Sequence, residues 1–467
     1  MQNDFSQGSV KRHIISQAIP LTIAQLVQIL YNLTDRVYIG HLPGASGLAL
    51  TGIGLIFPIV ALVSAFTTLF GMGGGSICAI ARGAGDTDRA EKIMTNTFTM
   101  LCVSSVFIMA VCYIFKRPVL YGLGASDATY AYANDYLSIY LIGTPFVMIS
   151  VGMNWFINSQ GFAKIGMMTV LCGAVLNIVL DPLFIFVFNM GIRGAAVATV
   201  ISQLVSALWV LKFIFGKKTL LKMRKKYAVP EKGIVKTVLS IGMAGFIMNG
   251  TNCLVQAVCN VVLSSYGDLY VGIMTVVNSI REIAQLPVSG IANGSQPVLG
   301  YNYGANRPER VKSGIKFSVM VGMIVSLIFW VTVMMFPRAY MAPFTSDPEM
   351  LRDGIPAIRI YYMAFFTMIL QFSGQHTFTA LGMAKPAIFF SLFRKAILVV
   401  PLAIFLPRTG LGAYGVFASE PISNVIGGIA CFTAMMLIVW RKLTRMERAN
   451  AEKSRPPVPN YKSIDKA

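Results

Sequence analysis

The sequence predicts an all-α membrane protein with twelve transmembrane helices in two six-helix lobes. Three observations lead to this prediction: the chain is rich in apolar residues, long apolar runs recur along it, and its two halves resemble each other. Of the 467 residues, 55% are hydrophobic and only 12% are charged, whereas a soluble domain carries about 25% charged residues. This composition leaves too little polar surface to cover a chain of soluble domains.

Twelve apolar runs are long enough to cross a bilayer, which takes about 20 mostly apolar residues. They begin near Ile14, Thr51, Ile93, Tyr132, Gly166, Gly194, Ile234, Tyr270, Gly314, Pro356, Pro386 and Gly412. We expect a cytoplasmic N-terminal segment at 1–13, an N-terminal lobe at 14–216, a basic cytoplasmic linker at 217–233, a C-terminal lobe at 234–440 and a disordered cytoplasmic tail at 441–467.

The basic residues predict the orientation. With the N-terminus inside, most of the 39 Lys and Arg residues fall on the cytoplasmic side, as basic residues do in multi-span proteins. The largest cluster lies in the central loop and comprises Lys217, Lys218, Lys222, Arg224, Lys225 and Lys226. Both termini are therefore predicted to be cytoplasmic. Because the bases alternate with apolar runs, the net charge of +20 indicates a lipid bilayer as partner and excludes nucleic acid.

An internal repeat relates the two halves at an offset of about 220 residues. Gly75-Ser76 matches Gly294-Ser295, Tyr140 matches Tyr361, and Gly191-x-x-Gly194 matches Gly412-x-x-Gly415. Each repeat holds an even number of spans, so both start on the same side of the membrane. The pseudo-two-fold axis must then run along the membrane normal, and a cavity between the lobes is the default binding site of a transporter.

Ionisable side chains inside the membrane are costly, so each is a functional candidate. Eight lie within the predicted spans: Asp35, Arg36, Asp181, Arg281, Glu282, Arg394, Lys395 and Glu420. Asn177 and Asp181 share one helix face at spacing i, i+4, and Pro182 loosens the helix beside them. The sixth span adds Thr199, Ser202 and Gln203. Together with Asp35 these oxygens suit Na⁺ or a shared proton. Alternatively, Asp35 pairs with Arg36 and Asp181 caps a broken helix.

The second half offers fewer acids. Glu420 is either a second proton site or the structural partner of a base, and Arg394 and Lys395 either carry positive charge into the span or extend to its inner end. Arg281 and Glu282 are neighbours about 100° apart on a helix, so they are expected to satisfy different partners. The predicted wall of a substrate cavity is Gln203, Asn249, Asn252, Gln256, Arg281, Gln371, His376 and Glu420, together with Gln375. Hydrogen bonding between helices explains the uncharged members equally well.

Other chemistry is not indicated. The chain has no Gly-x-x-x-x-Gly-Lys-Ser/Thr loop for ATP, and its three histidines are scattered. The seven cysteines lie in apolar stretches without a Cys-x-x-Cys pair, which predicts free thiols. We therefore expect no enzymatic activity, no cofactor, and no metal beyond a possible Na⁺.

Several motifs together resemble the MATE family of multidrug and toxin extrusion antiporters, and within it the DinF-like and MepA-like bacterial branch. They are Asp35-x-x-x-x-Gly40, Asn177-x-x-x-Asp181-Pro182 and Gly191-x-x-Gly194-Ala-Ala. The resemblance covers about residues 10–440. It implies a multi-pass protein of the bacterial cytoplasmic membrane that exports organic, often cationic, compounds in exchange for Na⁺ or H⁺. We expect it to act as a monomer.

The resemblance also implies roles for particular residues. The cation site of the DinF-like branch falls on Asp35, Asn177, Asp181 and Thr199, and Pro20 matches a proline at which the first helix bends. The NorM-like branch carries acids in spans 7 and 10, where this chain has none. The alternative function is a lipid-linked oligosaccharide flippase of the same superfamily, which would need basic residues converging on the central cavity.

Overall fold

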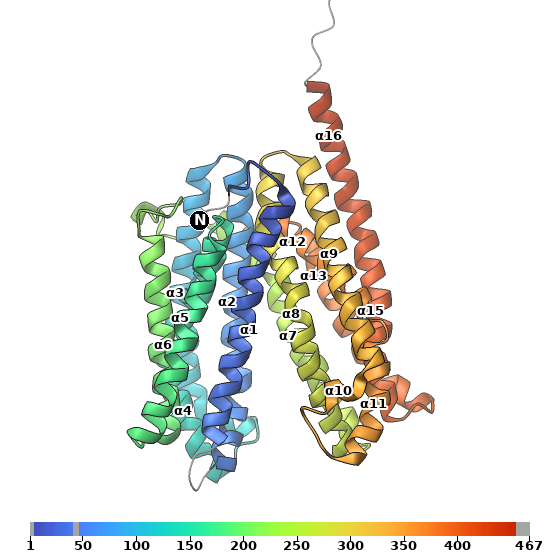
Figure 1. The fold of residues 1–467 in the computed structure, drawn as a ribbon. Helices are drawn as coiled ribbons and strands as arrows, with labels where there is room; N and C mark the ends of the chain where they lie inside the picture. Colours follow the sequence, from blue (N-terminus) through green and yellow to red (C-terminus); the bar gives the residue numbers. More distant parts are fainter. Residues whose placement is uncertain (1–3, 41–45, 454–467) are drawn as a thin grey trace, which may run out of the picture.

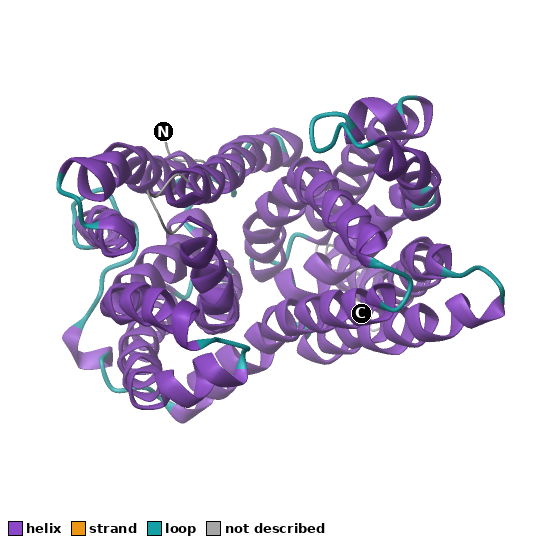
Figure 2. Cartoon of the chain, turned by 90° about the horizontal axis from the view of Figure 1, so that it is seen from below, coloured by secondary structure: helices purple, strands orange, loops and turns teal. Residues whose placement is uncertain are grey.

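The described part of the chain, residues 4–40 and 46–453 of a computed structural model, folds into helices without any strand. The helices stand side by side in two bundles (Figure 1), and the view along the helices separates the two bundles (Figure 2). The first bundle holds the helices of the N-terminal half and the second those of the C-terminal half. The predicted all-α architecture of two six-helix lobes is confirmed.

Six helices form the N-terminal lobe. They are α1 (Val10–Gly40), α2 (Ser46–Gly83), α3 (Thr87–Gly122), α4 (Asp127–Ser159), α5 (Ala163–Pro182) and α6 (Gly191–Ile214). After Pro182, α5 continues as a π-helical segment, Leu183–Val187. Ser126 begins α4 with a capping box, in which its side chain and that of Thr129 each accept a backbone N–H. This reciprocal pair satisfies two donors that would otherwise lack partners.

The C-terminal lobe contains the same six spans, but two of them are interrupted. Its helices are α7 (Lys232–Ser264), α8 (Asp268–Gly304), α9 (Pro308–Met335), α10 (Pro337–Met341), α11 (Pro348–Tyr362), α12 (Met368–Ala380), α13 (Ala384–Leu392), α14 (Val400–Phe405) and α15 (Ala413–Met435). A short 3₁₀ turn joins α11 to α12, and a π-helical segment, Phe393–Val399, joins α13 to α14. Each joined pair forms one span.

Eleven of the helical segments in the described residues are both long and apolar enough to cross a membrane. The remaining predicted span, which begins near Tyr270, corresponds to α8, which has 37 residues but is not among those eleven. Its sequence includes Arg281 and Glu282 and many uncharged polar residues. This span is therefore a long helix with an unusually polar composition.

The internal repeat extends to the backbone at an offset of 221 residues. For example, α4 begins at Asp127 and α11 at Pro348, and α2 ends at Gly83 and α8 at Gly304. Residues with positive φ pair at the same offset: Gly85 with Asn306, Gly161 with Gly382, Asn189 with Gly410 and Gly191 with Gly412. Gly and Asn are the residues that adopt this conformation most readily. The two lobes therefore share turns as well as helices.

The lobes meet through two symmetric pairs of close backbone contacts. A Cβ added at Gly83 would lie 1.9 Å from the carbonyl oxygen of Tyr301, and one added at Gly304 would lie 2.0 Å from that of Ile80. Ile80 and Tyr301 are themselves 221 residues apart, so each contact is the image of the other. Only glycine allows α2 and α8 to approach this closely.

Further interlobe contacts lie at the same end of the molecule. α1 packs on α8 where Gly294 meets Ala18, and α2 packs on α7 where Gly73 meets Val238. These contacts involve the first turns of α1 and α7 and the last turns of α2 and α8. Figure 1 shows the two bundles diverging toward the opposite end. The lobes are thus sealed against each other at the end where both begin.

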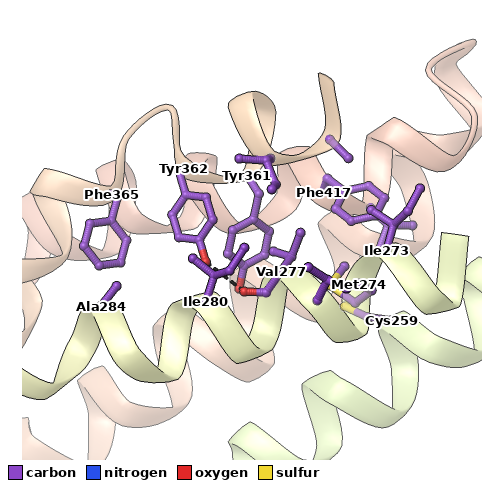
Figure 3. Packing of buried hydrophobic residues seen from close by; sticks show 14 of the residues in the cluster. Cys259, Ile273, Met274, Val277, Ile280, Ala284, Tyr361, Tyr362, Phe365 and Phe417 are labelled. Atoms are coloured by element: carbon purple, nitrogen blue, oxygen red, sulfur yellow. Dashed lines mark hydrogen bonds between the residues drawn. The ribbon is translucent and has the colours of Figure 1, made fainter. Parts of the chain in front are cut away.

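Each lobe has a hydrophobic core of its own. In the C-terminal lobe, Tyr361, Tyr362 and Phe365 pack against the face of α8 that carries Val277 and Ile280 (Figure 3). The hydroxyl of the fully buried Tyr362 donates a hydrogen bond to the Val277 carbonyl at 2.8 Å. This bond satisfies a polar atom in an apolar core. The seven cysteines are free thiols, as predicted.

The tail differs from its prediction. We expected a disordered tail from residue 441, but Arg441–Lys453 forms the helix α16, which continues α15 through a π-helical segment. Lys312 on α9 holds α16 through Glu447 at 2.5 Å and Thr444 at 2.8 Å. The prediction is therefore wrong for 441–453, because tertiary contacts stabilise a helix in this strongly charged segment. Residues 454–467 lie outside the described part.

The linker between α6 and α7 is attached to the N-terminal lobe. The Gln160 side-chain oxygen accepts hydrogen bonds from the backbone N–H groups of Leu220 at 2.8 Å and Leu221 at 3.2 Å. Farther along, Glu91 accepts from Arg224, and Asn96 Nδ2 donates to the Tyr227 carbonyl at 2.7 Å. This segment is thus an ordered part of the lobe surface.

Candidate functional site

The predicted cation-site residues come together inside the N-terminal lobe from α1, α5 and α6. Asn177, Asp181 and Thr199 are almost fully buried, and Asp35 is 8% exposed. The Asn177 amide donates to Asp181 Oδ1 at 3.2 Å and to Thr199 Oγ1 at 3.4 Å. The Asp35 and Asp181 carboxylates are close enough to interact electrostatically. The prediction that these four residues form one cluster agrees with this geometry.

Three oxygen atoms in this cluster are buried and have no hydrogen-bond partner among the described residues: Asp35 Oδ1, Asp181 Oδ2 and Asn177 Oδ1. Buried polar atoms are almost always paired, so orphaned acceptors call for an explanation. A small hard cation prefers oxygen ligands of this kind, and a proton could equally be shared between the carboxylates. The chemistry of the cluster therefore fits Na⁺ or H⁺. Within the described residues no group of three or more His, Cys, Asp or Glu side chains could hold a metal ion.

Neither structural alternative for the acids is seen as a direct contact, although Arg36 is near enough to interact electrostatically with Asp35. Arg36 is exposed and lies over the Phe57 ring at 5.7 Å, and no ion pair joins Arg36 to Asp35 among the described residues. Asp181 accepts from the Asn177 side chain, and its other oxygen is unpartnered. Asp181 therefore does not cap the broken helix end.

A cavity of about 300 Å³ lies beside the acidic cluster. Its walls come from α1, α2, α4, α5 and α6, and α8 of the other lobe closes it with Asn293, Gln296 and Pro297. The remaining polar lining consists mainly of amides and hydroxyls, and its aromatic residues are Tyr31 and Trp155. No charged side chain lines this cavity. Its neutral, hydrogen-bonding and aromatic surface suits a flat polar or weakly charged organic molecule.

Tyr31 and Thr199 belong to both the cavity and the acidic cluster. Both line the cavity, and the Tyr31 side chain is close enough to interact with Thr199, Asp35 and Asp181. Tyr136 of α4 also lies near Thr199 and Asp35. A change at the carboxylates can thus reach the cavity through one hydroxyl.

The equivalent region of the C-terminal lobe holds a buried ion cluster. Glu420 Oε1 accepts from Arg394 Nη1 at 3.0 Å and from Lys395 Nζ at 3.0 Å. Arg394 also donates to Asn424 Oδ1 at 2.7 Å, and Arg281 of α8 interacts electrostatically with Glu420. All three members of the ion pairs are at least nine-tenths buried. Of the two alternatives for Glu420, these contacts fit the structural partner of a base.

Most of the predicted cavity wall lies elsewhere, which corrects the prediction of a single lining set. Gln203 lines the cavity. In contrast, Gln371 and His376 are buried in the C-terminal lobe, where Gln371 donates to the Phe390 carbonyl at 3.0 Å and His376 bonds to Asn293 at 3.2 Å. Arg281 and Glu420 belong to the ion cluster.

The remaining predicted residues lie on α7 and α1. Asn252 and Gln256 are exposed on α7 and Asn249 is half-buried there, outside the cavity. Pro20 is buried within α1, which is one continuous helix from Val10 to Gly40. The polar α7 residues thus do not line the cavity.

Several lining residues were not identified from the sequence. They are Gln25, Gln28, Tyr31, Asn154, Asn158, Asn293 and Gln296. Uncharged amides occur in many helix–helix contacts, so their type alone does not distinguish a cavity. Tyr31 did carry a signal, because it stands one helical turn before Asp35 and therefore shares its face.

Comparisons with known proteins agree with this fold. The MatE family model matches residues 20–183 and 245–405. The multidrug export protein MepA of Staphylococcus haemolyticus (strain JCSC1435) is 24% identical over 442 residues, covering 95% of this chain and 96% of that protein. MepA of Staphylococcus saprophyticus is 24% identical over 448 residues, covering 96% of this chain and 97% of that protein.

Solved structures of similar fold cover nearly the whole chain. A MATE structure in the bent conformation superimposes with a TM-score of 0.90 at 23% identity, covering 97% of this chain and all of that one. An outward-facing structure of a multidrug resistance MATE family transporter superimposes with a TM-score of 0.88 at 23% identity, covering 95% of this chain and 98% of that one. The family model covers well over half of the sequence in two symmetric segments, one in each lobe. The chain therefore belongs to the MatE family of membrane transport proteins.

Proposed function

We propose that the chain is a secondary antiporter that exports organic, often cationic, compounds in exchange for Na⁺ or H⁺. The observation that carries this proposal is the sharing of Tyr31 and Thr199 between the acidic cluster and the neighbouring cavity. An antiporter must prevent substrate and coupling ion from acting independently. Two binding regions that share wall residues provide that link within one lobe.

The exchange follows from electrostatics. Two buried carboxylates without a bound cation repel each other and attract a positively charged molecule in the adjacent cavity. When Na⁺ or a proton neutralises Asp35 and Asp181, that attraction weakens and the hydrogen bond between Asn177 and Thr199 can rearrange. Cation entry therefore favours substrate release. The MepA relatives are named multidrug export proteins, which supports drugs and toxins as the substrate class.

The orientation completes the proposal. The protein resides in a bacterial cytoplasmic membrane as a monomer, with both termini in the cytoplasm. The end at which Gly83 and Gly304 seal the lobes is then cytoplasmic, so the cavity communicates with the outside in this conformation. Alternating access requires the lobes to open at that seal and close at the other end.

The flippase alternative has less support. It needs basic residues converging on a central cavity, whereas no charged side chain lines the cavity. Arg394 and Lys395 are instead paired with Glu420 inside one lobe. A pyrophosphate group would meet amides and aromatic rings in the cavity rather than cations.

The experiment is efflux from proteoliposomes containing the full chain, with a Na⁺ gradient and a pH gradient imposed separately. We expect one of the two gradients to drive ethidium transport. Asp35→Asn and Asp181→Asn should each abolish this transport while the protein still inserts into the membrane, because each removes one ionisable group from the cluster. Transport retained in both variants would overturn the proposal.

A further inference from the structure

The helix α8 has two chemically different faces. Ile273, Val277, Ile280, Ala284 and Val288 are buried in the core of the C-terminal lobe, and the first four of these point into that core (Figure 3). The opposite face is polar. Because an α-helix turns by about 100° per residue, the sequence number of each polar residue gives its angular position around α8.

That polar face looks toward the N-terminal lobe. Ser289 donates a hydrogen bond to Gln25 of α1 at 2.7 Å, and Asn293 and Gln296 close the cavity. Glu282 precedes Ser289 by seven residues and Asn293 by eleven, so it lies within about 20° of both on the helix surface. Glu282 therefore continues the face of α8 that forms the cavity wall.

The Glu282 carboxylate is exposed, and no salt bridge to it is found among the described residues. It stands near the middle of a 37-residue helix, where contact with lipid would be costly for a charged group. Its neighbour Arg281 interacts electrostatically with Tyr361 and Glu420 inside the lobe and, as the adjacent residue, with Glu282 as well. The two side chains leave the helix about 100° apart, so the Glu282 carboxylate stays on the face of α8 that continues the cavity wall toward the space between the lobes.

The opposite wall at this level is uncharged and polar. α1 and α8 run in opposite directions and meet where Gln25 contacts Ser289. Asn32 lies seven residues after Gln25 on α1, and Glu282 lies seven residues before Ser289 on α8. Because the two helices are antiparallel, Asn32 and Glu282 lie at the same height along the helix axes. Asn32 and Gln28 are exposed and are 3.4 Å apart through their side chains. The counterpart of Glu282 in the other lobe is Ala61, so the internal repeat does not duplicate this acid.

We propose that Glu282 is a cation-binding residue on the path between the cavity and the open side of the transporter, where it contacts positively charged organic substrates during entry or release. The proposal rests on the proposed export function and adds a specificity residue to it. About three helical turns, or roughly 16 Å, separate Glu282 from Asn293 along the helix axis. A substrate at Glu282 has therefore left the neutral cavity, and the carboxylate selects for positive charge at that point.

The test measures ethidium, a permanent organic cation, with the full-length protein. Equilibrium binding to the purified protein and the KM and maximal rate of efflux are compared for the wild type, Glu282→Gln and Glu282→Asp. We expect Glu282→Gln to raise Kd and KM about tenfold, which corresponds to about 1.4 kcal/mol, with little change in maximal rate. Glu282→Asp should restore most of the affinity.

Glu309→Gln, which removes an acid from the first turn of α9, is the matched control and should behave like the wild type.

Each outcome is decisive. An unchanged Kd and KM in Glu282→Gln overturns the proposal, as does a lower maximal rate with unchanged KM, because that pattern indicates a structural role. A wild-type protein that does not bind ethidium overturns it as well. If the wild type binds ethidium but neither ion gradient drives its transport, the antiport proposal fails, and the Kd comparison still decides the role of Glu282.

Discussion

Thr199 on α6 and Glu420 on α15 occupy equivalent positions in the two lobes, 221 residues apart, yet their surroundings are opposite in kind. Thr199 lines the cavity and accepts a hydrogen bond from Asn177. Glu420 is enclosed by Arg394 and Lys395. The same position in the repeat thus lines a cavity in the N-terminal lobe and belongs to a buried ion cluster in the C-terminal lobe.

The neighbouring positions show the same inversion. Gly173 and Ala174 line the cavity of the N-terminal lobe, and their equivalents are Arg394 and Lys395, whose long side chains fill the corresponding space. Gly427 makes room for them, because a Cβ there would lie 2.8 Å from Arg394 Cγ. Within the described residues, the positions that line the cavity in the N-terminal lobe thus hold ion-paired side chains in the C-terminal lobe.

Glu420→Gln should destabilise the protein strongly. The substitution leaves two buried cations without a carboxylate, and breaking a buried pair in this way costs about 3–5 kcal/mol. We expect a much lower thermal midpoint in detergent. Glu349→Gln, at an exposed first-turn position of α11, is the control and should shift the midpoint little. An unchanged midpoint for Glu420→Gln would show that the ion cluster does not stabilise the C-terminal lobe.

Thr199→Val should weaken coupling without unfolding the lobe. Valine keeps the shape of threonine but removes the hydroxyl that accepts from Asn177 and lies close to Tyr31. We expect the Kd for ethidium to change by no more than a few-fold, whereas the rate of efflux driven by the ion gradient should fall to a small fraction of the wild-type rate. Thr51→Val, at an exposed threonine near the start of α2, provides the same chemical change away from the site. Gradient-driven efflux at the wild-type rate in Thr199→Val would contradict the proposed link.

Gly304→Ala should disfavour the sealed end of the molecule. The added methyl group would sit 2.0 Å from the Ile80 carbonyl oxygen, so α2 and α8 could no longer approach. We expect Asn293→Cys, in a background without the exposed Cys253, to become more accessible to a membrane-impermeant maleimide from the cytoplasmic side. Gly250→Ala adds the same methyl group where no atom lies within 4 Å and should have no effect. Equal labelling in the two variants would contradict the assignment of the seal.

The sequence was sufficient to predict the fold, the repeat and the acidic cluster because each leaves a strong local signal. Apolar length predicts spans, and a buried Asp such as Asp181 stands out in hydrocarbon. The cavity wall was harder to predict because amides such as Asn154 and Gln371 are identical in type but opposite in environment. Both donate to a backbone carbonyl, Asn154 to that of Gly166 and Gln371 to that of Phe390. Only the packing distinguishes them, because Asn154 also lines the cavity whereas Gln371 is buried. The helix α16 was missed because its stabilising contacts come from α9.

Gln160→Ala should release the linker from the N-terminal lobe. Gln160 is fully buried, and its side-chain oxygen accepts from Leu220 N, Leu221 N and the Thr219 hydroxyl at 2.8–3.2 Å. Loss of these bonds leaves the backbone N–H of the buried Leu221 unsatisfied, at a cost of about 1–3 kcal/mol, and also frees the N–H of the exposed Leu220. We expect trypsin to cleave the linker after Lys217 or Lys218 at least tenfold faster. Glu231→Gln, which removes only the exposed pair with Lys92, should change the rate little. Equal cleavage in the two variants would show that the linker is held by other contacts, and its order would then depend on Glu91 and Asn96.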